Sequence, residues 1–401
     1  MTDQTELSPA TARAILLLSL ATFTSMSTQR VCDAMLPELA RVFDAPLSEA
    51  AQVISYFAIT YGLMQLFYGP IGDRYGKFRV VIFATLGCAV GCALAAMSQG
   101  LQVLVWARVL TAVAAAAIIP MSLAWVGDAV SYAVRQETLA RVGLGTMLGI
   151  AGGQVFGGLM SDTLGWRWAF GLLSVQFAGV SWLLHRHGSR VGQAATHALA
   201  PGRFTTQLVQ VAQDPWARIL LSIALVEGAV VFGVMAIAAT HLHTTHGVSL
   251  TAAGMIAGLF GVGGMLYMAS ARHTIRLVGE VGLARWGGGL MAASFALLAL
   301  TPWWGLAAPA CLVAGFSFAM FHNTMQAKAT QMVPTARATG VTLFAGFLFW
   351  GQSLGVWMLA YGMQVTSTRL LISAMALCIA ALGWFFGRAI DHRNATQADH
   401  L

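Results

Sequence analysis

The sequence predicts an all-α membrane protein with twelve transmembrane helices in two six-helix halves. Three observations predict this fold class. Hydrophobic residues make up 58% of the 401 residues and charged residues only 9%, whereas a soluble domain carries roughly 25% charged residues. The apolar residues form long continuous runs, and a helix needs about 20 of them to cross a bilayer. A polar stretch near the middle divides these runs into two equal sets.

The first half begins with a polar segment and then contains six apolar runs. The segment "MTDQTELSPATAR" carries two acids and leads into a run that is too long for a signal-peptide core, so we expect it to remain on the chain. The runs lack the short alternating segments of outer-membrane barrel strands, which favours helices. The six expected spans are 12–36, 49–71, 80–98, 101–125, 141–160 and 168–185.

The second half follows the longest polar stretch, "GSRVGQAATHALAPGRFTTQLVQVAQD". We therefore expect an N-terminal half over 1–187, a cytoplasmic linker over 188–214 and a C-terminal half over 215–401. Two six-helix halves are typical of transporters built from repeats with a central site. The expected spans of the second half are 216–240, 250–270, 282–301, 304–327, 339–361 and 368–387.

The positive charges predict the orientation of the chain. Basic residues concentrate in cytoplasmic loops, and a cytoplasmic N-terminus places most of the 22 Lys and Arg residues on that side. The outer loops would then hold only Arg41, Arg167 and Arg369, and Arg30 and Arg108 would lie within the membrane. We expect both termini in the cytoplasm of a bacterium and the chain in its inner membrane. This topology accounts for the net charge of +7, so the sequence indicates no nucleic-acid partner.

The cysteines and histidines do not have the spacing of a metal site. His241, His243 and His246 crowd the outer end of the seventh span, but spacings of two and three residues do not align them on one helix face, so we expect a wet loop. No nucleotide loop and no nucleophile with a nearby base is present in the sequence, which argues against an enzyme and against a cofactor. All five cysteines fall within expected spans and are expected in the core: Cys32, Cys88, Cys92, Cys311 and Cys378.

A charged loop, "GPIGDRYGKFR" over 69–79, joins the second and third spans. Gly69, Asp73, Arg74, Gly76 and Lys77 follow the pattern G-x-x-x-D-R-x-G-R/K-R/K up to its last base. This loop resembles the signature of the major facilitator superfamily.

Three further segments extend the resemblance to the drug/proton antiporter branch of that superfamily. Arg108 lies in "WARVLTAV" like the family's membrane-embedded arginine motif, "GIAGGQVFGG" in the fifth span is similar to the motif of its antiporters, and "GWRWAF" follows. The resemblance covers the whole chain in topology and is specific mainly over 20–170. It implies the major facilitator fold and export of a small organic molecule.

The resemblance implies a gate in the charged loop. In the family this loop clamps the two halves on the cytoplasmic side when the transporter opens outward. We therefore expect a gate formed by Gly69, Asp73, Arg74, Gly76, Lys77 and Asp128. Within it we expect Arg74 to pair with Asp128, near the end of the fourth span. The alternative is that the basic residues of the loop only fix the topology.

The fifth span carries glycines at every fourth position, which lines one helix face with hydrogen atoms and lets a neighbouring helix pack against its backbone. The residues of this antiporter-type face are Gly145, Gly149, Gly153, Gly157 and the adjacent Gly158. The family's antiporter motif usually has proline where this chain has Gln154. A face that slides or bends during transport and a purely structural contact are both consistent with the pattern.

Asp33 and Arg108 are ionisable residues within the first and fourth spans. Such groups are costly in a bilayer, usually face a partner or a wet cavity, and mark a pathway. At a rise of about 1.5 Å per residue, Asp33 lies about one turn and Arg108 about two turns from the outer ends of their spans, so their depths allow contact. Arg30 shares the helix face of Asp33 and predicts a local ion pair.

Asp33 is suited to carrying a proton. Burial disfavours the charged form of a carboxyl and a nearby cation favours it. In the drug/proton exporters that this chain resembles, an acid at this place, shortly before "LPELARVF", serves the proton step. The alternative is that Asp33 only ends the helix at the outer interface. Two arginines beside one acid favour a neutral, zwitterionic or anionic cargo.

Glu227 lies midway along the seventh span and is the deepest acid of the second half. It is either a ligand for cargo or proton, or a group buried against a neighbouring helix, and no basic partner is obvious from the sequence. Gln154, His322 and Asn323 are candidate cavity residues, and hydrogen bonds between helices are the alternative for them.

These observations together predict a proton-coupled antiporter that exports a drug, siderophore or metabolite, with the proton as coupling ion and no other cofactor. Its expected partners are the small-molecule substrate and the lipid bilayer, and we expect a monomer. An importer or uncoupled facilitator of the same fold is the first alternative, since fold does not fix direction or substrate. A non-transporting membrane sensor or partner subunit is the second.

Overall fold

The structure is a computed structural model that describes residues 8–188 and 203–398, and this part of the chain is helical, without strands. The helices of the first half are α1 (Pro9–Arg30), α2 (Leu36–Val42), α3 (Leu47–Ala50), α4 (Gln52–Tyr75), α5 (Lys77–Ala96), α6 (Leu101–Ala129), α7 (Tyr132–Asp162) and α8 (Trp166–Gly188). Those that follow are α9 (Arg203–Gln213), α10 (Pro215–Glu227), the π-helix η1 (Gly228–Phe232), α11 (Gly233–His246), α12 (Leu250–Leu300), the 3₁₀ turn η2 (Trp304–Leu306), α13 (Ala307–Ala329), the 3₁₀ turn η3 (Pro334–Ala336), α14 (Arg337–Gly362) and α15 (Thr368–Ala398).

Eleven helical segments of the described chain are long and apolar enough to cross a membrane. One of them, α12, has 51 residues, which at 1.5 Å per residue is about 75 Å, more than twice the roughly 30 Å of a bilayer core. Gly279 breaks it with a φ of 64°, a conformation that glycine adopts without steric cost. The two parts of α12 correspond to the expected spans 250–270 and 282–301, so the predicted all-α membrane fold is confirmed.

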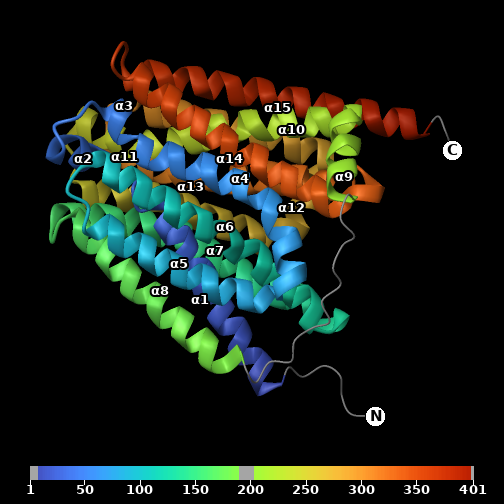
Figure 1. Cartoon of the computed structure of the whole chain (residues 1–401). Helices are drawn as coiled ribbons and strands as arrows, with labels where there is room; N and C mark the ends of the chain where they lie inside the picture. Colours follow the sequence, from blue (N-terminus) through green and yellow to red (C-terminus); the bar gives the residue numbers. More distant parts are fainter. Residues whose placement is uncertain (1–7, 189–202, 399–401) are drawn as a thin grey trace.

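The helices form two bundles that meet along two seams. In the first half α1 packs on α7, and α5 packs on α6 and α8; in the second, α12 packs on α13 and α15, and α10 on α14. Between the halves, α7 packs against α12 and α4 against α14. The start of α1 and the end of α15 lie at one end of the bundle, called here the terminal end, while α2 and α3 mark the opposite, distal end (Figure 1).

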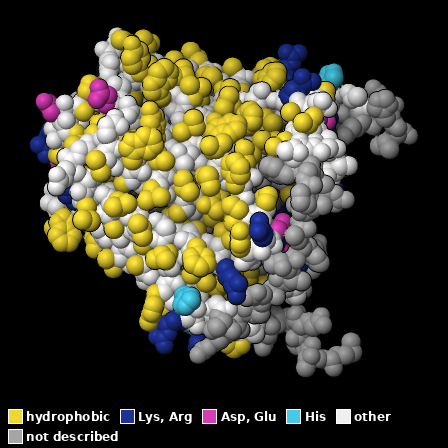
Figure 2. Space-filling view, in the orientation of Figure 1, with side chains coloured by type: hydrophobic (Ala, Val, Ile, Leu, Met, Phe, Trp, Pro, Cys, Tyr) yellow, Lys and Arg dark blue, Asp and Glu magenta, His cyan; other side chains and the backbone are white. Residues whose placement is uncertain are grey.

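Each half has its own hydrophobic core, and the outside of the bundle is also apolar. One buried cluster is built mainly from α1 to α8 and the other mainly from α10 to α15. Large apolar side chains such as Phe83, Val175 and Leu377 are more than 70% exposed. Figure 2 shows hydrophobic side chains over the middle of one face and charged side chains towards its ends. Such a surface suits lipid rather than water.

The glycine face of α7 lies directly against the backbone of α1. A Cβ atom on Gly145, Gly149, Gly153 or Gly157 would lie 2.1 to 2.6 Å from the carbonyl oxygens of Ser19, Phe23, Ser27 and Val31, in that order. Any side chain would therefore force the two helices apart. The backbone-to-backbone packing predicted from the glycine spacing is present, and α1 is the partner that the spacing alone did not identify.

The expected linker contains a helix. Residues 189–202 of the predicted 188–214 segment lie outside the described residues, and the remainder comprises the last residue of α8, the helix α9 and Asp214, which caps α10. Gln207 of α9 accepts a hydrogen bond from Thr339 of α14 at 2.7 Å. This bond attaches α9 to the terminal end of the second half.

Candidate functional site

Asp33 lies in the turn that follows α1 and is fully buried. Gln154 of α7 donates a hydrogen bond of 2.8 Å to its Oδ2 atom. The predicted ion pair with Arg30 is present, with Nη1 3.7 Å from the same oxygen. Asp33 therefore does not end a helix at an exposed interface; it holds α1 and α7 together beside the glycine seam.

Arg108 is fully buried but does not pair with Asp33. Among the described residues no ion pair joins the two within 4.0 Å, although their depths in the membrane allowed contact. Instead the guanidinium donates to the carbonyl oxygens of Thr28 at 2.7 Å and Val53 at 3.3 Å and lies 4.1 Å from the Phe57 ring centroid. Backbone carbonyls of α1 and α4 are nearer than the carboxylate and satisfy the cation first.

Glu227 has a basic partner that lies 95 residues further along the chain. The last residue of α10, it is fully buried, and His322 Nδ1 of α13 lies 3.0 Å from its Oε2 atom. The His322 ring lies 5.0 Å from that of Phe318 and 5.5 Å from that of Phe344 between centroids. Asn323, the next residue on α13, is partly exposed, and among the described residues no hydrogen bond joins it to Glu227 or His322.

Aromatic rings connect the Asp33 pair of the first half to the Glu227 pair of the second. The Arg30 guanidinium lies 4.2 Å from the ring centroid of Phe232, which packs on Phe318 at 5.2 Å. Phe318 in turn stacks on His322. We refer to Asp33, Arg30, Phe232, Phe318, His322 and Glu227 as the central chain of contacts. Sequence reasoning missed its two phenylalanines, because nothing in an apolar run marks which ring meets an arginine.

The π-helix η1 places Phe232 in this chain of contacts. It follows Glu227 directly, and π-turns within helices occur frequently at functional sites. Gly228 packs so closely on α14 that a Cβ would lie 2.0 Å from the carbonyl oxygen of Leu348. Nearby, Gln29 of α1 donates to Gln352 of α14 at 3.5 Å, so two buried amides also join the halves. Gln352 lies in the apolar run "FWGQSLGVW" and is a signal that could have been found in the sequence, whereas Gln29 lies in the polar stretch "TSMSTQR".

Several buried polar atoms of this site have unused hydrogen-bonding capacity. Arg30 Nε, Nη1 and Nη2, Asp33 Oδ1, Gln154 Oε1 and Glu227 Oε1 have no hydrogen-bond partner among the described residues. Buried polar groups in native proteins are normally paired. The arrangement can therefore accept a proton or the polar groups of a small molecule without first breaking a strong hydrogen bond.

The distal end of the bundle is bridged between the halves. Asp162, at the end of α7, accepts hydrogen bonds of 2.6 Å from both the backbone nitrogen and Oγ1 of Thr251, at the start of α12. Gln364 donates to Ser48 across the same end. The last glycine of the predicted face, Gly158, lies against the carbonyl of Leu250 rather than against α1.

The charged loop makes its ion pairs within the first half. Lys77 contacts Asp128 and lies 4.0 Å from Asp73, whereas the Arg74 guanidinium lies 5.3 Å from the Tyr75 ring. The expected Arg74–Asp128 pair is therefore wrong. Lys77 begins α5, which packs along α6 where Asp128 lies, while Arg74 is exposed on the last turn of α4.

The glycines of the loop have different environments. Gly76 has a φ of 90° between α4 and α5, which explains why glycine is required there. A Cβ on Gly69 would meet no atom within 4 Å. Whether the loop acts as a gate stays a prediction.

The expected wet histidine loop is wrong. All three histidines belong to α11, and His241 is fully buried, with Nδ1 2.6 Å from Thr368 Oγ1 and Nε2 3.2 Å from the Leu298 carbonyl oxygen. These two partners stabilise a polar ring in the core. The five cysteines lie inside the bundle as free thiols, Cys378 being partly exposed.

Known proteins resemble the chain over long stretches. The MFS-type transporter YwfA of Bacillus subtilis is 27% identical over 155 residues, which are 39% of this chain and 38% of that protein. The multidrug export protein EmrB of Escherichia coli is 26% identical over 153 residues, 38% of this chain and 30% of that protein. The matched part thus spans well under half of these relatives.

Solved structures share the fold of nearly the whole chain. A bacterial homologue of the human lysosomal transporter Spinster, in an inward-facing and unoccupied conformation, has a TM-score of 0.76 at 16% identity and covers 96% of this chain and 98% of its own. The nucleoside transporter NupG has a TM-score of 0.74 at 14% identity and covers 94% of this chain and 99% of its own.

The family assignment rests on the sequence and agrees with the fold. The family model of the Major Facilitator Superfamily matches residues 18–356, which include both halves and both buried acid–base pairs. The helical bundle, the two seams and the structural neighbours agree with this match. The chain belongs to the Major Facilitator Superfamily, a family of transporters rather than enzymes, and is a multi-pass membrane protein.

Proposed function

We propose that this transporter is a proton-coupled antiporter that exports a small organic molecule across the bacterial inner membrane. The observation that carries the proposal is the buried carboxyl of Asp33, which has one oxygen without a hydrogen bond and forms an ion pair with Arg30, whose guanidinium nitrogens have no hydrogen-bond partner among the described residues. An ionisable residue within a membrane protein marks an ion or substrate path. Asp33 lies at the contact between α1 and α7, and α7 also packs against α12 of the other half. A change in the charge of Asp33 therefore acts on the helix that contacts both halves.

Protonation of Asp33 and binding of cargo exclude each other in this mechanism. The ionised carboxylate attracts Arg30 at 3.7 Å and accepts the Gln154 hydrogen bond. The cargo binds to the ionised form, in which the free Oδ1 atom of Asp33 accepts a hydrogen bond from a donor group of the cargo. A proton on Asp33 removes that acceptor and its charge, so the cargo is released. The inward proton gradient thereby drives cargo out, and the proton is the coupling ion.

Alternating access uses the two seams between the halves. With both termini in the cytoplasm, the distal end faces the periplasm, and the Asp162–Thr251 bonds close it. Cargo would then enter from the cytoplasmic side. Opening the distal end requires α7 to separate from α12, and the side-chain-free face of α7 allows it to slide along α1 as it does so.

The relatives support export but leave the cargo class open. EmrB is a multidrug export protein, while the structural neighbour NupG transports nucleosides by its name. We therefore assign a small organic molecule as substrate, the lipid bilayer as surroundings and a monomer as the working unit.

The test compares Asp33→Asn with wild type in proteoliposomes under an imposed pH gradient. Asp33→Asn keeps the size of the side chain and its bond to Gln154 but cannot ionise, so we expect it to lose gradient-driven transport and to keep exchange of cargo across the membrane. Asp44→Asn is the matched control, because Asp44 is exposed on the distal side. Uphill export by Asp33→Asn would remove this residue from the mechanism, and a wild type that only equilibrates cargo would indicate an uncoupled facilitator.

A further inference from the structure

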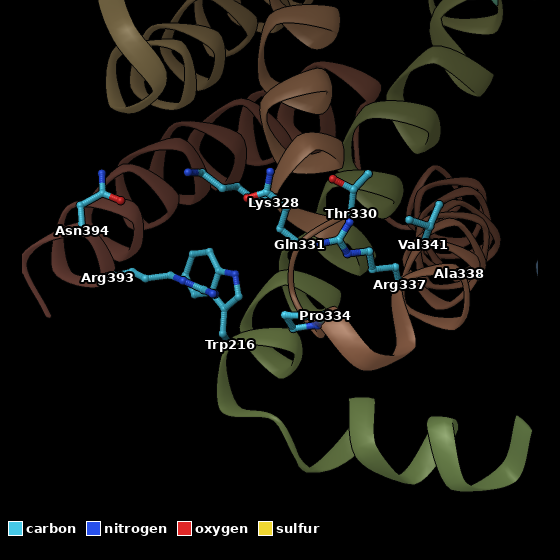
Figure 3. A pocket seen from close by; sticks show the side chains of 10 residues that line it. All are labelled: Trp216, Lys328, Thr330, Gln331, Pro334, Arg337, Ala338, Val341, Arg393 and Asn394. Carbon is cyan, nitrogen blue, oxygen red and sulfur yellow. The ribbon is translucent and has the colours of Figure 1, made fainter. Parts of the chain in front are cut away.

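A pocket of about 580 Å³ lies at the terminal end of the second half, away from the central chain of contacts. It is a partly open pocket lined by the start of α10, the end of α13, the start of α14 and the end of α15 (Figure 3). We call it the basic pocket, and its lining residues are Trp216, Lys328, Thr330, Gln331, Pro334, Arg337, Ala338, Val341, Arg393 and Asn394. No carboxylate is among these lining residues.

Three cations line the basic pocket from three different helices. Figure 3 shows Arg337 and Arg393 extending from opposite sides of it, with Lys328 above. The Arg393 guanidinium lies 4.5 Å from the Trp216 ring, and its Nη1 atom is buried without a hydrogen-bond partner. Within the described ranges, Arg337 has no carboxylate within 4.0 Å.

The carboxylates near the pocket already have other partners. Glu280 pairs with Lys328 at 2.6 Å, and Asp214 accepts the backbone N–H of Ala217 at 2.7 Å as the cap of α10. Asp391 pairs with Arg285 at 2.6 Å. Asp214 also attracts Arg393 electrostatically but forms no ion pair with it within 4.0 Å among the described residues, so both arginines of the pocket have capacity left for an additional anion.

The start of α14 adds backbone donors to the same wall. Arg337 and Ala338 are the first residues of this helix, and the preceding Ala336 provides no side-chain cap. The N–H groups of a first helical turn have no acceptor within the helix and favour a negative charge. Phosphate oxygens match this combination of arginine forks and backbone N–H groups.

We propose that the basic pocket binds a phosphate group at the membrane surface. Its two sources are the headgroup of an anionic phospholipid and a soluble phosphate. Basic pockets between membrane helices on the cytoplasmic side bind such headgroups, and α9 is attached beside the pocket through Thr339. The bound phosphate links α10, α13, α14 and α15 and thereby stabilises the terminal end of the second half.

Two measurements on the purified full chain test the site and distinguish the sources. Native mass spectrometry counts the phosphatidylglycerol molecules that remain bound, and thermal unfolding compares inorganic phosphate with chloride at equal ionic strength. The variants are Arg337→Gln and Arg337→Gln/Arg393→Gln. Arg276→Gln is the matched control, because Arg276 is exposed on α12 outside the pocket.

We expect Arg337→Gln to weaken binding about tenfold, the size of one charge-assisted hydrogen bond, and the double variant to abolish it. If the variants retain one phosphatidylglycerol molecule fewer than wild type, the ligand is a lipid headgroup. If they instead lose the thermal stabilisation by inorganic phosphate, the ligand is a soluble phosphate. Arg337 is exposed, so the single variant will fold even if the double variant does not. Equal retention and equal stabilisation in wild type, Arg337→Gln and Arg276→Gln would overturn the proposal.

Discussion

The Glu227–His322 pair is the most isolated polar contact of the second half. Glu227 is fully buried and His322 is enclosed by the rings of Phe318 and Phe344. Removing one partner of a buried pair leaves the other without compensation, which costs about 3 to 5 kcal/mol. Replacing both partners costs much less, because no buried charge is left behind.

The variant His322→Ala should therefore unfold at a clearly lower temperature than wild type in detergent, by thermal unfolding of the purified protein. The double variant His322→Ala/Glu227→Gln should recover part of the loss. His273→Ala is the control, because His273 is exposed on α12 and should leave the unfolding temperature unchanged. Equal unfolding temperatures for the single and double variants would show that the two side chains are not coupled.

Individual site residues were predictable where the pattern is local. The Arg30–Asp33 pair follows from a spacing of three residues on one helix. The Glu227–His322 pair spans 95 residues of sequence and leaves no periodic signal. His241 was assigned to a wet loop because the spacing of the three histidines does not align them on one helix face, but the Thr368 hydroxyl and the Leu298 carbonyl stabilise it inside the bundle.

Among the helices, α7 is the element on which both halves depend. One of its faces presents glycines to the carbonyl oxygens of α1, and another presents carbonyl oxygens to glycines of α12. A Cβ on Gly254 of α12 would lie 2.4 Å from the carbonyl oxygen of Gln154. The helix is thus in backbone contact on two sides.

A methyl group on the α1 side of α7 should destabilise the protein. In Gly153→Ala the new Cβ would lie 2.6 Å from the carbonyl oxygen of Ser27, and overpacking of this kind costs about 1 to 3 kcal/mol. We expect a lower unfolding temperature and a lower transport rate. Gly143→Ala is the matched control on the same helix, since its Cβ would meet only Met268 Cε at 3.5 Å. Equal stability of the two variants would contradict a tight seam.

The helices themselves were predictable because a bilayer requires long apolar runs. The spacing of Gly145 to Gly157 also predicted a close contact. The identity of its partner was not predictable, because α1 presents carbonyl oxygens there and every residue type has one. The sequence of the charged loop correctly predicted an ion pair with Asp128 but assigned it to Arg74 instead of Lys77. The two residues are only three positions apart, but Arg74 ends α4 whereas Lys77 begins α5.

For the whole molecule, the hydrogen bonds at the distal end join the two halves there. Asp162 accepts the free N–H at the start of α12, so a carboxylate of one half caps a helix of the other. Substituting a capping side chain costs about 0.5 to 2 kcal/mol. If the cap forms in only one of two conformations, this free energy favours the conformation in which the distal end is bridged.

The variant Asp162→Ala should shift the population towards the state that is open at the distal end. The reporter is Ala34→Cys in a background without the native cysteines, because Ala34 is fully buried and a Cβ on Gly254 of α12 would lie 3.5 Å from its own Cβ. We expect maleimide to label the reporter about fivefold faster, the effect of roughly 1 kcal/mol. Glu49→Ala, an exposed acid at the distal end, is the control and should not change the rate. An unchanged rate in Asp162→Ala would show that the bonds to Thr251 do not hold the end closed.

The two-half arrangement was predictable from the polar stretch and the equal number of runs on each side. The seams were not, because α7 meets α12 and α4 meets α14 through residues far apart in the sequence, such as Asp162 with Thr251 and Gly62 with Gly346. The break at Gly279 follows from length, since one bilayer cannot contain 51 helical residues.

The hydrogen bonds of Arg108 have a consequence for biosynthesis. An arginine within a membrane helix costs up to about 2.5 to 3.5 kcal/mol, the value at the helix centre, when the helix inserts into the membrane by itself. Its acceptors are carbonyls of α1 and α4, and both helices leave the ribosome before α6. The order of synthesis therefore places the acceptors of Arg108 in the bilayer before α6 is inserted. A chain from which α1 is deleted should insert α6 poorly, even though every residue of α6 is intact.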